Sequence, residues 1–333
     1  MACPIDLSWV YSLSFFALGI TVIMTGMAYA LGQALSNPRL NVWAKGEIFQ
    51  VFVSIFLVML ILYLNDSFCT FSYSDLAGLS PAGAALYTHP PISGGEPVYD
   101  VAEKYLMNLG AFSDEAMRAV RSANGLMEIA GRYSRSPCVP PLALCLLGQN
   151  SLTNRPYSGS TLWMQVGGLA LYTNTISYLT VLIQIAFIKF ITTRGILLLL
   201  PLAIIFRSLP FMRQLGGGLI AIGVAVFLLY PGLLVVESLF WNPYSMLSEG
   251  ELDAVYSMSG RTEFSYSVVA HPLGSDYPGI EDSFRPALKA SAVALLSSTF
   301  LFAFNIIAIT AAAREFGRLL GQEVDLSRLV QIL

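Results

Sequence analysis

Five long apolar runs constrain the fold of this chain more than any other feature of its sequence. At a helical rise of about 1.5 Å per residue, each run is long enough to cross about 30 Å of hydrocarbon. Only 12% of the 333 residues are charged, whereas about 25% is usual in soluble domains. A soluble core would accommodate one such run, but not five. The sequence therefore predicts an all-α polytopic membrane protein with transmembrane helices at residues 9–32, 48–64, 161–188, 216–241 and 286–312.

Basic residues beside these runs give the predicted orientation. They cluster in alternate connections, and basic residues close to a span favour the cytoplasmic side. We therefore expect a multi-pass protein of the cytoplasmic membrane, surrounded by lipid, with its N-terminus outside and its C-terminus inside. The basic residues assigned to the inner side are Arg39, Lys45, Lys189, Arg194, Arg207, Arg213, Arg314, Arg318 and Arg328.

A shorter apolar run at residues 195–206 decides the number of spans. Twelve helical residues reach only about 18 Å, and Pro201 would kink such a helix. We interpret residues 195–213 as a re-entrant or broken helix that returns to the inner face, and the alternative is a sixth span. Gly216, Gly217 and Gly218 open the next run, where they favour a hinge or close helix packing.

These assignments divide the chain into five parts. Residues 1–64 hold the first two spans, and residues 65–160 form a small, helical extracellular subdomain. Residues 161–241 hold the third span, the re-entrant segment and the glycine-rich fourth span. An acidic outer loop at 242–285 leads to the last span and an amphipathic cytoplasmic tail at 286–333. Within the subdomain, apolar spacing predicts one helix over residues 98–109 and a second one capped by Ser113, which together make a helical hairpin.

All four cysteines lie in the segments assigned to the outside, where an oxidising environment permits disulfides. Four cysteines allow three pairings; one of them joins Cys138 to Cys145 and leaves Cys3 with Cys69. A metal site is the alternative interpretation. The spacing matches no CxxC pattern and the chain has only two histidines, so we expect no metal.

Enzyme motifs are missing from the sequence, since it has no HExxH, GxSxG, Walker loop or GxGxxG pattern. We therefore expect neither enzymatic activity nor a cofactor. Polar residues inside the spans are more informative, because they avoid lipid. They indicate either interhelical hydrogen bonds within one subunit or a wet pathway or subunit interface. These residues are Thr173, Ser177, Thr180 and Gln184 in the third span, and Ser291, Ser298 and Asn305, seven residues apart, in the last.

Three charged residues near the membrane boundaries complete the set of candidates. Arg207 and Arg213 flank the end of the broken helix. Their guanidinium groups would contact phosphates in an inner vestibule, or would simply anchor the inner face. Glu237 lies one turn from the outer end of its run, where we expect its side chain to snorkel towards water.

Short motifs in the spans resemble the CedA family of the archaeal DNA-import (Ced) system and its Thermoproteales relatives. That family is similar to the TrbL-type inner-membrane channel subunit of bacterial conjugation (type IV secretion) machines. The similarity covers the spans and leaves the outer loops almost unmatched. The motifs are FRSLPFMR at 206–213, GGGLIAI at 216–222 and LYP at 229–231, with NPR and WAK within 37–45 and ARE and LLGQEVD within 313–325.

The resemblance implies a homo-oligomeric channel through which single-stranded DNA passes. It also implies a cytoplasmic hexameric ATPase as motor and a thin pilus built from small membrane pilin subunits. The acidic outer loops depart from what DNA binding would favour, which leaves the path of the DNA open. Two alternatives are a secondary transporter of a small solute that uses the broken helix, and a pore-less scaffold for pilus assembly. Transporters usually carry inverted repeats and a buried ionisable pair, and the sequence reveals neither.

Overall fold

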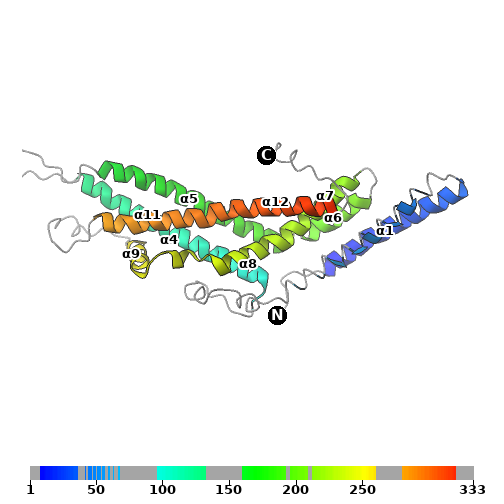
Figure 1. Cartoon of the computed structure of the whole chain (residues 1–333), viewed down its shortest axis with the longest axis horizontal. Helices are drawn as coiled ribbons and strands as arrows, with labels where there is room; N and C mark the ends of the chain where they lie inside the picture. Colours follow the sequence, from blue (N-terminus) through cyan, green and yellow to red (C-terminus); the bar gives the residue numbers. More distant parts are fainter. Residues whose placement is uncertain are drawn as a thin grey trace, which may run out of the picture. The chain divides into compact units, whose positions relative to one another are not determined.

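A computed structural model describes residues 8–36, 96–132, 160–192, 196–208, 212–259 and 280–319, together with scattered positions between 42 and 67. In these ranges the chain is built from helices and contains no strand (Figure 1). The predicted all-α class is therefore confirmed for the described part of the chain. The four cysteines and the inner-side residues Arg39, Arg194 and Arg328 lie outside it.

Three helical stretches are long and apolar enough to cross a membrane: Thr161–Phe190, Gln214–Met246 and Phe284–Arg318. They coincide with the predicted spans at 161–188, 216–241 and 286–312. The first predicted run forms α1 (Ser8–Ala34), of which Leu18–Ala34 is a shorter apolar helix. The run at 48–64 is described only at isolated helical positions, so it remains a prediction.

The helices form two compact units. The first unit contains Met1–Leu106, Ile183–Trp241 and Phe302–Leu333, and the second contains Met107–Leu182 and Asn242–Leu301.

A tight helical hairpin in the first unit explains the short run after the third span. Helix α6 (Ile196–Ser208) has 13 residues and contains a buried Pro201, and α7 (Arg213–Val224) packs beside it (Figure 1). A Cβ atom at Gly216 would lie 2.6 Å from the Cα atom of Arg207 and 2.8 Å from the carbonyl oxygen of Ala203. A side chain at Gly216 would therefore collide with the backbone of α6, and the close approach of the two helices depends on glycine at this position.

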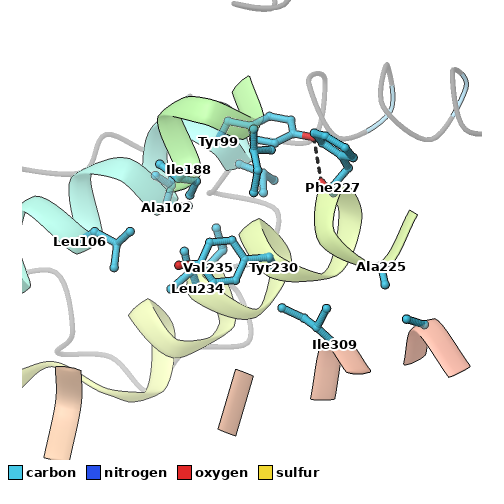
Figure 2. Packing of buried hydrophobic residues seen from close by; sticks show 14 of the residues in the cluster. Tyr99, Ala102, Leu106, Ile188, Ala225, Phe227, Tyr230, Leu234, Val235 and Ile309 are labelled. Atoms are coloured by element: carbon cyan, nitrogen blue, oxygen red, sulfur yellow. Dashed lines mark hydrogen bonds between the residues drawn. The ribbon is translucent and has the colours of Figure 1, made fainter. Parts of the chain in front are cut away.

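Helix α7 continues without a break into a π-helical segment, η3 (Ala225–Leu229), and then into α8 (Tyr230–Phe240). Their apolar side chains form the core of the first unit together with the start of α4, the end of α5 (Ser160–Phe190) and α12 (Leu301–Leu319) (Figure 2). Fully buried members of this core include Tyr99, Leu106, Ile188, Tyr230 and Leu234.

The second unit packs the rest of α4 and α5 with η4 (Pro243–Met246), α9 (Glu249–Ser259), α11 (Ile280–Leu295) and the π-helical segment η5 (Leu296–Phe300). Small side chains allow these helices to approach closely. Edge-to-face ring pairs join Phe112 to Tyr244 and Trp163 to Phe284. The buried alanines are Ala116, Ala119 and Ala123 on α4, Ala170 on α5, and Ala287, Ala290 and Ala294 on α11.

The predicted hairpin of two short helices is wrong. Helix α4 runs without interruption over 35 residues, Val98–Arg132. Ser113 does not cap a helix; it is fully buried inside α4. The apolar spacing of Leu109, Phe112 and Ala116 continues across the expected break, and core packing outweighs the turn-forming preference of the residues between them.

Candidate functional site

A hydrogen bond between Tyr99 and the backbone of η3 joins the start of α4 to the middle of an apolar span. In an α-helix the carbonyl of Phe227 would accept a hydrogen bond from the N–H of residue 231, but residue 231 is proline and has none. The Tyr99 hydroxyl donates to that carbonyl oxygen instead, at 3.1 Å (Figure 2). The Tyr99 hydroxyl thus supplies the buried Phe227 carbonyl oxygen with a donor that residue 231 cannot provide.

At the start of α4, the helix face opposite Tyr99 is charged. Asp100, Glu103 and Lys104 follow the i, i+3, i+4 spacing of one helix face, and Asp100 is exposed. Lys104 forms an ion pair with Glu96. Glu103 forms one with Lys189 at 3.3 Å, with about half of the lysine side chain exposed. The start of α4 therefore has an apolar face in the core and a charged face outside it.

The ion pair between Glu103 and Lys189 differs from the predicted topology. That topology assigns Lys189 to the inner face and residues 65–160 to the outside, whereas the structure brings the two side chains together.

A second polar cluster in the first unit, and a buried one, surrounds Glu237 of α8. The carboxyl group interacts with the amide of Asn305 on α12 and lies within electrostatic reach of Tyr105 and Tyr230. The Tyr230 hydroxyl donates to Oε1 of Gln184 at 3.5 Å. Oε1 of Glu237 is enclosed by protein, whereas the residue as a whole is half-buried, so the expectation that this side chain snorkels stays a prediction.

The two arginines at the turn are only partly described. Arg207 is buried, with 7% of its surface exposed, so its guanidinium group does not line an open surface of the single chain. Arg213 begins α7, and its side chain lies outside the described set. Contact of either residue with phosphate stays a prediction.

The polar stripe predicted on the third span is shifted around the helix. Ser177 and Gln184 are buried, whereas Thr173 and Thr180 lie at the edges and bond to carbonyl groups of their own helix. The structure adds Asn174, whose Nδ2 donates to Oγ of Ser291 at 2.9 Å in the second unit. This bond supports the interpretation as interhelical hydrogen bonding for that pair.

The stripe predicted on the last span is interrupted. Ser291, Ser298 and Asn305 are all buried, but η5 lies between the first and the last of them. A π turn takes one residue more than an α turn, which rotates the following residues by about 100° relative to a regular helix. Accordingly, Ser291 meets α5 while Asn305 meets α8.

Comparisons with known proteins give no relative from which to assign a function: no family model matches the chain, and neither do curated proteins or solved structures. In the described residues, no group of three or more His, Cys, Asp or Glu side chains is arranged to hold a metal ion.

The sequence patterns do not single out Tyr99, Glu103 or Asn174. The proline four residues after Phe227 indicates that one intrahelical donor to the Phe227 carbonyl is missing, but nothing in the sequence identifies the Tyr99 hydroxyl as a donor to it.

Proposed function

We propose that this chain is a channel subunit of an archaeal DNA-import or conjugation-like apparatus, and that single-stranded DNA crosses the cytoplasmic membrane through an oligomer of it. The single observation that carries the proposal is the charged face of α4, at Asp100, Glu103 and Lys104, beside apolar membrane helices. The resemblance of the span motifs to the CedA family supplies the cargo, the ATPase and the pilin partners.

The depth of this face follows from the α6–α7 hairpin. Because α6 is apolar from Ile196 to Phe206, we infer that it lies in hydrocarbon and that the turn with Arg207 marks the cytoplasmic boundary. Phe227, which accepts the Tyr99 hydrogen bond, is 14 residues beyond Arg213, or about 21 Å along the helix. The charged start of α4 then lies within the hydrocarbon layer.

Such a face is incompatible with lipid. A charged side chain in the hydrocarbon interior costs about 2.5–3.5 kcal/mol even on the most lenient scales. The face therefore meets water or another subunit. A homo-oligomer around an aqueous passage provides both water and a neighbouring subunit. We therefore infer that Asp100 and Glu103 line the passage. In this arrangement the start of α4 is a further membrane-embedded segment, added to the five spans and the broken helix. The N-terminus outside and the C-terminus inside remain part of the proposal.

Accessibility of single cysteines tests the proposal. Asp100→Cys should react in intact cells with a charged, membrane-impermeant thiol reagent above the level of the unsubstituted protein, and the modification should block uptake of labelled single-stranded DNA. The matched control is Phe304→Cys, because Phe304 is an exposed apolar side chain on α12 for which we expect lipid contact. Equal, low labelling at both positions would contradict an aqueous passage. Labelling at Asp100→Cys without an effect on uptake would favour the pore-less scaffold.

A secondary transporter is the second candidate, and the Glu237 cluster favours it. Buried ionisable residues in membrane helices often belong to ion or substrate pathways, and Glu237 interacts with Asn305 and lies within electrostatic reach of Tyr105 and Tyr230. Solute uptake into vesicles that contain only this protein, abolished by Glu237→Gln, would favour the transporter over the DNA channel.

A further inference from the structure

Three polar atoms in the Glu237 cluster make no hydrogen bond of normal geometry to a described residue, although the Asn305 amide lies close enough to the Glu237 carboxyl group to interact with it. They are Oε1 of Glu237 and both the Oδ1 and Nδ2 atoms of Asn305. Asn305 is 1% exposed, so bulk water does not reach its amide. Unpaired buried polar atoms are rare and costly, which indicates that something other than the described residues completes this pair.

The surroundings of the carboxyl group are neutral. Tyr105 on α4, Tyr230 on α8 and Asn305 on α12 are the described residues that interact with Glu237. No described lysine or arginine forms an ion pair with it. An ionised carboxylate without a cationic partner is strongly disfavoured inside protein, and the group then binds a proton instead.

A proton on Glu237 would supply the donor that Oδ1 of Asn305 lacks, and a small approach of the two side chains would then pair Nδ2 of Asn305 with Oε1 of Glu237. We propose that Glu237 and Asn305 form a proton-binding site in which the neutral carboxylic acid closes a two-hydrogen-bond ring with the amide. The acid O–H donates to Oδ1 of Asn305, and Nδ2 of Asn305 donates to Oε1 of Glu237. A metal cation at the same place would pair with the two oxygen atoms but would leave Nδ2 unpaired, because an amide N–H₂ group is a donor only.

The site joins two helices, because Glu237 belongs to α8 and Asn305 to α12. Loss of the proton would remove the donor to Oδ1 and leave an unpaired anion between them. The proton therefore holds the α8–α12 contact closed. This inference is independent of what passes through the membrane.

Infrared difference spectroscopy of the purified protein in detergent, with ¹³C-labelled glutamate, tests the assignment. At pH 7 we expect the carbonyl band of one protonated glutamic acid, which Glu237→Gln removes. The control is Glu251→Gln, because Glu251 on α9 accepts a hydrogen bond from Lys289 at 2.6 Å and should be ionised. Absence of the band at pH 7, or a band that disappears in Glu251→Gln and persists in Glu237→Gln, would overturn the proposal.

A second variant covers the case in which Glu237→Gln does not fold. Asn305→Leu removes the acceptor of the acid proton, so the band should remain but move to the higher frequency of a carboxylic acid that lacks this hydrogen bond. In addition, the unfolding equilibrium constant should rise at least tenfold for Asn305→Leu and less than threefold for Glu237→Gln, since glutamine still pairs with asparagine through two hydrogen bonds. An unshifted band in Asn305→Leu would refute the ring.

Discussion

Removal of the Tyr99 hydroxyl tests whether a missing backbone donor explains the position of α4. In Tyr99→Phe the ring remains in the core, and only the donor to the Phe227 carbonyl is lost. Both residues are buried and their hydrogen bond is 3.1 Å long. Leaving a buried acceptor without this donor costs about 1–3 kcal/mol, so the unfolding equilibrium constant should rise by a factor of about 5 to 150.

The decisive measurement repeats the substitution in a Pro231→Ala background. Alanine supplies the N–H that proline lacks, so the Phe227 carbonyl regains an intrahelical donor. In that background Tyr99→Phe should cost less than about 0.5 kcal/mol, and the double-mutant cycle should give a coupling energy of about 0.5 kcal/mol or more.

Reversible unfolding in mixed micelles, followed by circular dichroism, measures the four proteins of the cycle. Equal costs of Tyr99→Phe in the two backgrounds would refute the reasoning, because they would mean that the hydroxyl does not replace the proline's missing donor. An unchanged stability of the single variant would refute it as well.

Two further predictions concern the hairpin and a surface ion pair. Gly216→Ala should destabilise the protein by about 1–3 kcal/mol because its Cβ atom would overlap the α6 backbone. Gly223→Ala is the matched control, since the space there is open and helix propensity should make it neutral or stabilising in thermal melts. The hydrogen bond from Lys289, followed by the Ser248 backbone N–H, lowers the pKa of Glu251 from 4.5 to about 2. Its contribution to stability, below about 1 kcal/mol for a surface pair, should be complete above pH 4.5 and lost as the pH falls towards 2. Melting temperatures of the wild type and Glu251→Gln should therefore converge in acid, and a constant difference would contradict this assignment.

The apolar spans were predictable because length and apolarity alone determine them. The runs at 216–241 and 286–312 needed no knowledge of their neighbours, and both form long apolar helices. The short run before Arg207 was also identified as too short to cross, and it forms the 13-residue helix α6.

The position of α4 was not predictable in the same way. Mean hydropathy averages over all faces of a helix. The charges at Asp100, Glu103 and Lys104 lower it for the whole segment, although the face with Tyr99 and Tyr105 packs in the core. The sequence therefore gives no indication that the first residues of this segment pack into the core of the first unit. Only the tertiary partners of each face, such as Phe227 and Lys189, reveal where it packs.

The π-helical segment η5, at Leu296–Phe300, has a consequence for any alignment of related sequences. Deletion of one residue there would restore a regular α-helix and turn Asn305 away from Glu237, although composition and helix content would barely change. Sequences that share the two polar residues but differ by a single-residue gap in this segment should therefore not be expected to share the pairing. Structure-guided placement of that gap, rather than identity at the two positions, decides whether a homologue retains the site.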